Sequence, residues 1–282
     1  MKHSFSVFLF LFLFSEITTA QSSSSSEQLI HGNLSFGAAI PQNEFRANTT
    51  SAGFGGNLNF YFPLRKEVPL FLGGGFGYYN FGRHAQDLHE DLNVSAGSTI
   101  ISTIPVDLEV VTNNNLVNGF FAIRYVIPVP VVQPYIEAKG GFNYLYTRTR
   151  VLDNTNDRIF TKDQDNNEIN SKTISSGFTF AYGIEGGFII KPWKEFGINV
   201  NAAYLYGGRT KYYDKSQTQQ WNVSFNGQAS SFDPNHIDPG TLSVNDEAAI
   251  PRKSITDMLI VSLGFTFYIS EKSDNKYTPP IN

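Results

Sequence analysis

Cysteine is absent from the 282-residue sequence, and charged residues make up only 16% of it. Without a thiol the chain has no disulfide bond, no thiolate nucleophile or metal ligand, and no thiol-linked lipid anchor. No apolar run approaches the roughly twenty residues that a membrane-spanning helix needs. Lys and Arg do not cluster along the chain and the formal net charge is −4, which argues against nucleic acid as a partner because nucleic-acid binders usually carry a basic patch.

The first twenty residues are typical of a secretory signal peptide. Lys2 precedes the unbroken apolar stretch 7–14, and residues 18–20 offer small side chains for a signal peptidase. An uncleaved N-terminal anchor is the alternative. We expect residues 1–20 to be removed and the serine-rich segment 21–28 to form a flexible lead-in.

From Leu29 onward, apolar or aromatic side chains alternate with Gly, Asn or other small polar residues. A period of two predicts β-strands, and the content of 25 Phe, 14 Tyr and 24 Gly fits strands that pack aromatic side chains beside glycines. The alternation predicts eight strands, at about 29–41, 52–63, 70–83, 115–128, 135–150, 175–190, 197–213 and 256–270.

The lengths of the connections favour a membrane barrel over a soluble sandwich, which would also show alternation. Short links (64–69, 129–134 and 191–196) alternate with long polar ones (42–51, 84–114, 152–173 and 214–255). In an up-and-down meander this places short turns on the periplasmic side and long loops outside. Because lipid leaves no open sheet edge solvated, we expect an all-β fold: a closed antiparallel up-and-down transmembrane β-barrel of eight strands over 29–270, with a periplasmic tail at 271–282.

The alternation also assigns side chains to the lumen. Glycines at 73, 75, 77, 183 and 187 point inward and leave room in a narrow barrel. Four charged residues also point inward: Arg124, Glu137, Lys139 and Glu185. Two interpretations stay open for them, namely a polar plug or gate, and a charge network that only satisfies its own members.

Aromatic residues near the strand ends are placed for the two interfacial girdles of a membrane barrel, although ordinary β packing is the alternative for each. The residues are Phe62, Trp193, Tyr144, Tyr146, Tyr204, Tyr206 and Tyr268.

Patterns for catalysis or metal binding are weak. Residues 163–168 begin like an EF-hand loop, but Glu168 stands where the sharp turn needs Gly, and Ile174 stands where the bidentate Glu belongs. No Ser–His spacing identifies a nucleophile and its base among the candidate histidines His31, His84, His89 and His236. We therefore expect no catalytic residues, no metal site and no cofactor, and a protein that is not an enzyme.

Several strands, among them LGGGFGYYNFG, PYIEAKGGFNYLY, FAYGIEGGF and the closing LIVSLGFTFYIS, resemble the small outer-membrane β-barrel proteins of the porin-like superfamily. The resemblance covers nearly the whole chain after residue 20. It implies a location in the cell outer membrane of a Gram-negative bacterium. One departure is the tail 271–282, since these barrels often end on an aromatic residue that the assembly machinery reads; here Phe267 or Tyr268 would serve from an internal position.

The sequence thus predicts a monomeric barrel with a structural or surface-interaction role, long external loops and a filled polar lumen. The expected partners are outer-membrane lipid, the barrel assembly machinery, and an external ligand or protein bound through the long loops. The alternatives are a channel or carrier for small molecules, a barrel component of a secretion or surface-assembly machine, and a soluble exported barrel with a ligand inside.

Overall fold

A computed structural model describes residues 30–49, 51–65, 68–96, 99–155, 167–193, 196–213, 223–225, 242–244 and 251–269. The expected signal peptide, lead-in and tail, and residues 163–166 of the acidic loop, lie outside this part of the chain. None of the helices in the described ranges is long and apolar enough to cross a membrane.

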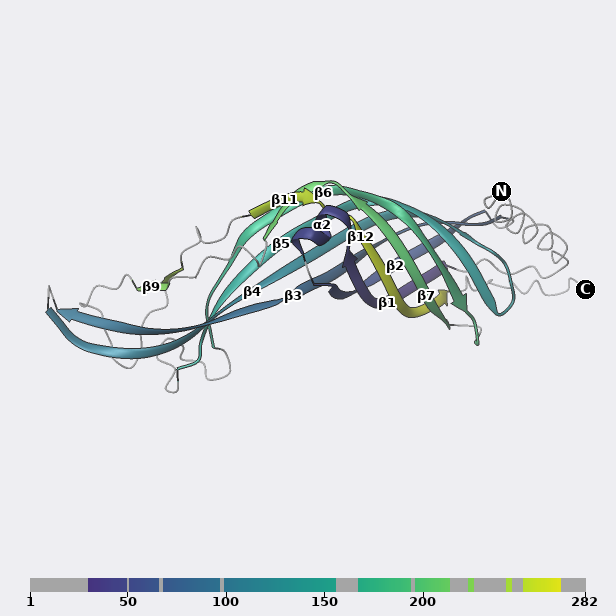
Figure 1. Ribbon diagram of the computed structural model, residues 1–282. Coiled ribbons are helices and arrows are strands. Elements are labelled where there is room, and N and C mark those ends of the chain that lie inside the picture. The colour runs from purple at the N-terminus through teal and green to yellow at the C-terminus, as the bar shows by residue number, and fades with distance from the viewer. Residues whose placement is uncertain are drawn as a thin grey trace, which may run out of the picture. The chain divides into compact units, whose positions relative to one another are not determined.

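Eight antiparallel strands close into a barrel (Figure 1). Around the barrel the order is β1-β12-β7-β6-β5-β4-β3-β2, so that consecutive barrel strands are neighbours. Closure comes from β1, which pairs with β2 on one edge and with β12 on the other. The strands are β1 (Ile30–Pro41), β2 (Gly53–Arg65), β3 (Val68–Ala96), β4 (Thr99–Val126), β5 (Val132–Asp153), β6 (Glu168–Ile190), β7 (Phe196–Gly207) and β12 (Met258–Ile269). The predicted fold is confirmed.

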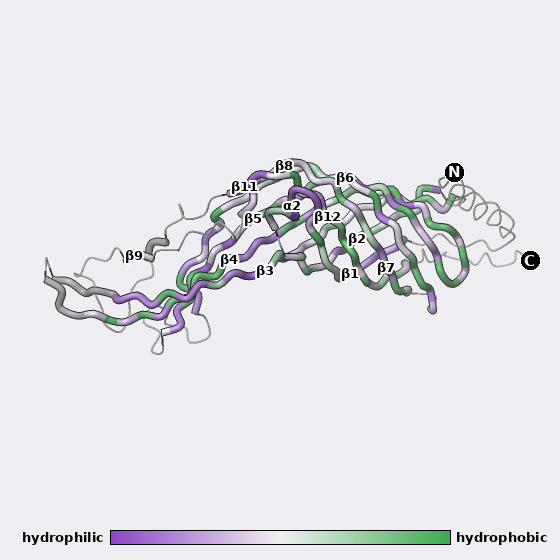
Figure 2. The backbone as a smooth tube through the Cα atoms, viewed as in Figure 1, coloured by the Kyte–Doolittle hydropathy of each residue, from purple (hydrophilic) through white to green (hydrophobic). Residues whose placement is uncertain are grey.

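Side chains alternate strictly between the two surfaces of the barrel. Large apolar side chains face outward and stay exposed, for example Phe121 at 82% and Phe180 at 78%, while residues of opposite parity such as Asn118 on β4 and Asn143 on β5 are fully buried inside. Hydrophobic residues are spread along the barrel strands, whereas in the extension beyond the barrel β3 is largely hydrophilic and β4 is mixed (Figure 2). An apolar exterior around an interior that buries polar side chains is the pattern of a barrel surrounded by lipid.

The segment 84–114, expected to be a long polar loop, instead forms the outer half of a β-hairpin. Pairing of β3 with β4 continues past a bulge at 80–83 as far as the pair Ala96↔Thr99. Gly82 has φ 99°, a backbone conformation that side-chain-bearing residues rarely adopt. Buried Val106, Leu108 and Val110 continue the period-two pattern of β4, which explains why the strand does not end at the rim. The polar residues of 84–91 hide this pattern in the sequence.

The other long connections also carry short elements. β7 ends at Gly207 and not at 213 as expected, and a separate β8 (Arg209–Tyr213) pairs with β11 (Pro251–Ile255). A second small ladder joins β9 (Val223–Phe225) to β10 (Leu242–Val244). Helix α2 (Asn43–Asn48) lies in the connection between β1 and β2.

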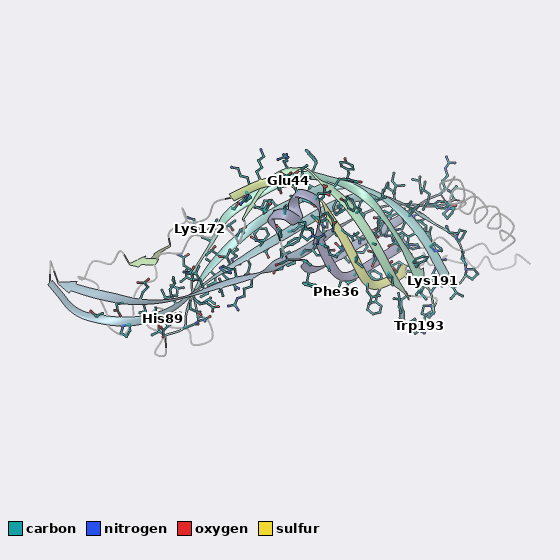
Figure 3. All side chains as sticks on the ribbon, in the orientation of Figure 1. Phe36, Glu44, His89, Lys172, Lys191 and Trp193 are labelled. Atoms are coloured by element: carbon teal, nitrogen blue, oxygen red, sulfur yellow. The ribbon has the colours of Figure 1, made fainter. Side chains whose placement is uncertain are left out.

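His89, on the outer part of the β3–β4 hairpin (Figure 3), offers a test of that pairing. Its Nδ1 lies 2.6 Å from Oδ1 of Asp107, which stands directly opposite on β4. This hydrogen bond, followed by the charge of Asp107, raises the pKa of His89 above its ordinary value. The contact therefore stabilises the hairpin below the pKa of the unpaired imidazole, and this contribution is lost as the pH rises through the folded pKa.

We expect NMR titration of the His89 ring protons in detergent micelles to give a pKa above about 6.5. Asp107→Asn should bring the pKa down, whereas Glu90→Gln, which removes a nearby charge that does not contact the ring, should leave it nearly unchanged. A His89 pKa that does not respond to Asp107→Asn would show that the hairpin is not paired in this register.

Candidate functional site

The four charged residues expected in the lumen lie together inside the barrel. Arg124 on β4, Glu137 on β5 and Glu185 on β6 are direct cross-strand neighbours in one row. Nε of Arg124 lies 2.7 Å from Glu137, and its Nη2 lies 3.5 Å from Glu185. Nζ of Lys139 lies 3.1 Å from Glu137 and 2.5 Å from Glu185. Two cations and two carboxylates thus balance each other in the buried interior.

Two tyrosines hold the guanidinium of Arg124. Its Cζ lies 3.8 Å from the ring centre of Tyr61 and 4.0 Å from that of Tyr135. Arg124 Nη2 donates to the Tyr61 hydroxyl at 2.8 Å, and the Tyr135 hydroxyl donates to Glu185 at 2.7 Å. Because Arg124 is 0% exposed, these aromatic faces and oxygens replace much of the water that would solvate the guanidinium, and only its Nη1 has no hydrogen-bond partner.

Around this charge cluster an apolar plug fills the turn-side end of the lumen. It is formed by Tyr61, Phe71, Ala122, Val126, Tyr135, Ile189 and Tyr268. His31 packs against Phe71 and Tyr268, with ring centroids 4.4 and 4.9 Å apart. The inward glycine at 73 is required here, since a Cβ at this position would collide with the ring of Tyr61. We name this set the turn-side plug.

A polar layer lies beyond the charge cluster. Asn118 and Asn143 are fully buried, and their side-chain amides have no protein hydrogen-bond partner. A cavity of about 20 Å³ is lined by Asn118, Lys139, Glu185, Asn201 and Ser262 among others. This volume suits one or two water molecules and nothing larger, and its polar walls provide the hydrogen bonds that buried water needs.

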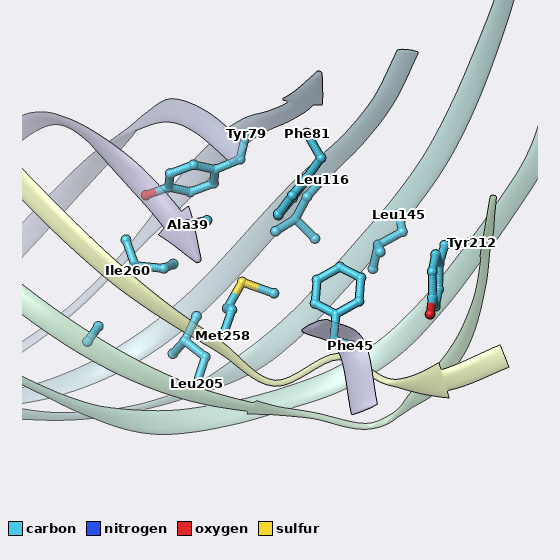
Figure 4. Close-up of a cluster of buried hydrophobic side chains, with 11 residues drawn as sticks. Ala39, Phe45, Tyr79, Phe81, Leu116, Leu145, Leu205, Tyr212, Met258 and Ile260 are labelled. Atoms are coloured by element: carbon cyan, nitrogen blue, oxygen red, sulfur yellow. The ribbon is translucent and has the colours of Figure 1, made fainter. Parts of the chain in front are cut away.

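A second apolar cluster fills the loop-side end of the barrel, and α2 carries its centre. Phe45 is 1% exposed and packs edge-on against Phe81 and Tyr212, with ring centroids 5.6 and 5.3 Å apart. Figure 4 shows Phe45 projecting from α2 among side chains of several strands. The cluster also contains Ala39, Tyr79, Leu116, Leu145, Ala203, Leu205, Met258 and Ile260. We name it the loop-side plug.

Polar contacts fix α2 over the barrel. Asn43 Nδ2 donates to Asp257 Oδ2 at 2.8 Å, and Glu44 forms an ion pair of 3.1 Å with Arg209. The Gln42 backbone N–H donates to the Asp257 carbonyl at 2.9 Å. Residues from the β1–β2 and β7–β12 connections therefore close this end together, an arrangement for which the sequence showed no signal.

The aromatic residues expected at the interfaces separate into two groups by strand end. Phe62 and Trp193 are exposed near the short turns, and Trp193 stacks on Phe196 at 4.5 Å. Near the long connections Tyr144 stacks on Tyr146 at 5.7 Å, and Tyr204 lies 4.8 Å from Tyr206. The alternation also exposes Tyr78, Tyr125 and Tyr182, which the sequence reading did not select.

Tyr268 does not lie in an interfacial girdle as the sequence predicted. It is 8% exposed and belongs to the turn-side plug, with Lys191 Nζ 3.8 Å above its ring. The reason is alternation: outward Phe265 and Phe267 on β12 place residue 268 on the inner face. Of the two aromatic residues considered as an assembly signal, only Phe267 therefore faces outward.

The candidate histidines do not come together. His31 lies in the turn-side plug, His84 and His89 lie on the β3–β4 hairpin, and His236 lies outside the described residues. Within the described ranges no three His, Asp or Glu side chains are grouped so that they could hold a metal ion.

No family model and no curated protein sequence matches the chain. Solved structures do match, at low similarity. Neisserial surface protein A is 11% identical, with 84% of this chain and 94% of that chain covered and a TM-score of 0.35. Ail, the attachment invasion locus protein of Yersinia pestis, solved with the heparin analogue sucrose octasulfate, is 12% identical, with 85% and 97% covered and a TM-score of 0.30.

A third solved structure contradicts the expectation that the chain is not an enzyme. The outer membrane protease OmpT from Escherichia coli is 10% identical, with 88% of this chain and 99% of that chain covered and a TM-score of 0.34. The expectation that the chain is not an enzyme was therefore wrong. At this similarity the match concerns the fold alone and transfers no activity.

Location follows from the architecture. A closed sheet leaves no unpaired edge, and its outer surface is apolar between two sets of aromatic residues. Its interior holds a buried charge cluster and a polar layer as well as the two apolar plugs. These features are those of strands that cross an outer membrane. The chain is an outer-membrane β-barrel protein of eight strands.

Proposed function

We propose that this protein is an occluded outer-membrane barrel whose work is done on its external side, as a structural or surface-interaction protein. The support comes from the lumen, which is filled in three layers: the turn-side plug with its charge cluster, the polar layer, and the loop-side plug under α2. The single observation that carries the proposal is the complete burial of Arg124 between two tyrosine rings, because a water-filled pore would expose this guanidinium.

The external side offers surface for partners. Beyond the barrel β3 and β4 continue as a hairpin, and β5 and β6 reach Asp153 and Glu168. Exposed charged residues on the hairpin, such as Arg83 and Asp91, suit a polar ligand or a protein and discourage pairing between sheet edges. Outer-membrane lipid is the partner of the apolar band, and we retain the barrel assembly machinery as the partner during insertion, with Phe267 as the outward aromatic of β12.

A channel or carrier for small molecules is the second candidate function. The observation in its favour is the polar layer, where buried Asn118 and Asn143 amides lack protein partners and suit a hydrated path. For conduction both plugs would have to open, which requires α2 to leave the barrel and the Tyr61–Arg124–Tyr135 stack to separate. A role within a secretion or surface-assembly machine is tested by the proteins that co-purify with the barrel.

Planar-bilayer recording decides between the first two functions. We expect the reconstituted protein to show no stable conductance steps, because apolar side chains fill both ends of the lumen. The Phe45→Ala variant should also show no conductance steps, since the turn-side plug remains. An open porin inserted under the same conditions serves as the positive control. Steady single-channel steps from the unmodified protein would contradict the occluded barrel and favour the channel.

A further inference from the structure

Two lysines face each other on the outer surface of the β8–β11 ladder. Lys211 and Lys253 are direct cross-strand partners, and both side chains are exposed. Their neighbours Thr210, Tyr212 and Ser254 are buried toward the lumen, and the Ser254 hydroxyl donates to the Tyr212 hydroxyl at 3.0 Å, which fixes the two lysines on the outward face. Like charges directly opposite each other destabilise a ladder.

These lysines lie at the height of the loop-side aromatic residues. The backbone of Lys211 lies against Gly177 of β6, and Gly177 is followed on its outward side by Phe178, the cross-strand partner of Tyr144. Aromatic side chains at this level mark the headgroup region of a bilayer. Arg148 and Arg150 stand further out on the outward face of the adjoining β5.

The cations of this region differ in their partners. Arg209 is paired with Glu44, and Arg148 and Arg150 share Glu168 at 3.3 and 3.7 Å. Within the described part of the chain, Lys211 and Lys253 have no carboxylate partner. Among the described residues, the outward face above the aromatic residues therefore holds positive charge in excess, and the Lys211–Lys253 cross-strand pair is its unpaired part.

We propose that Lys211 and Lys253 form a binding site for the phosphate of a lipid headgroup in the outer leaflet, with Arg209 at its edge. The chemistry of the site identifies phosphate as the ligand, because a pair of lysine ammonium groups binds phosphate as a concentrated positive charge. The position of the site identifies the source of the phosphate, because the anions at this depth of the membrane are those of lipid headgroups. A phosphate between the two lysines also removes the repulsion that the ladder otherwise carries. The inference rests on the proposed orientation, with β8 and β11 on the external side.

The test uses the full barrel in detergent, with native mass spectrometry after addition of lipid A that carries its phosphates. We expect the unmodified protein to retain this lipid and Lys211→Gln/Lys253→Gln to retain it about tenfold less. Arg46→Gln/Arg65→Gln is the matched control, since it removes two exposed cations elsewhere and should retain lipid like the unmodified protein. Lipid A without phosphates should be retained weakly by all three proteins.

Two other outcomes would contradict a binding site for lipid phosphate. Equal retention of lipid A with and without phosphates would show that acyl chains alone hold it, and complete displacement by millimolar inorganic phosphate would show a site for soluble anions. Orientation is tested separately: because the chain has no cysteine, Asp91→Cys on intact cells should react with an impermeant maleimide. Failure of that labelling would refute the orientation while leaving the phosphate site itself measurable.

Discussion

Replacing Arg124 by Met should lower the free energy of unfolding by about 3 to 5 kcal/mol, which is the usual cost of removing one partner from a buried ion pair. After the substitution Lys139 is the one cation of the cluster that remains beside Glu137, which is 1% exposed. Lys139 also contacts Glu185, so that one positive charge faces two carboxylates. It also removes the guanidinium from between Tyr61 and Tyr135. The measurement is urea unfolding of the barrel in phospholipid vesicles.

Adding Glu137→Gln to Arg124→Met should recover part of the loss, because Lys139 and Glu185 then form a balanced pair. In the unmodified background Glu137→Gln should be destabilising, so the two changes couple. Arg148→Met provides the control: its guanidinium is half exposed in an external ion pair with Glu168, and the expected effect is within about 0.5 kcal/mol. If the second change recovers nothing, the four charges do not act as one network.

Ile184→Arg should impair assembly more than the same change at outward positions nearer the long connections on β6. Ile184 is 61% exposed on the outer surface and lies six residues from the turn-side end of β6 at Ile190. At about 3.3 Å per residue and a tilt near 45°, this is roughly 14 Å above that end, close to the middle of an apolar band about 25 Å tall. Arginine at this depth costs about 2 to 4 kcal/mol.

Two positions on the same strand complete the depth series. Phe180 lies nearer the long connections, where its carbonyl accepts the Gly208 N–H, so Phe180→Arg should cost about 0 to 1 kcal/mol, as near an interface. Thr173→Arg, on the exposed extension, should be close to neutral. Folding yield and urea unfolding in vesicles of fixed thickness give the comparison. Equal effects at the three positions would mean that lipid does not surround this face.

Alternation in the sequence was sufficient for the barrel strands and for the inward direction of Arg124, Glu137, Lys139 and Glu185. Side-chain direction in a strand depends only on local geometry, so a period of two assigns faces without knowledge of the partners. The same rule, applied to β12, places Tyr268 inside, and the sequence could have predicted this. The extended hairpin could also have been found from Val106, Leu108 and Val110, but the polar residues of 84–91 favoured a loop.

The sequence by itself therefore determined the eight strands within the barrel, their two faces and the closure of the sheet, because these depend on local periodicity and on the solvation of backbone groups. Only the tertiary structure decided which distant side chains meet. Phe45 enters the loop-side plug through the pairing of α2 with the β7–β12 connection, and Lys211 reaches Lys253 through the register of β8 with β11. Long connections carry no periodic signal that sets such a register, so it depends on contacts between segments far apart in the chain.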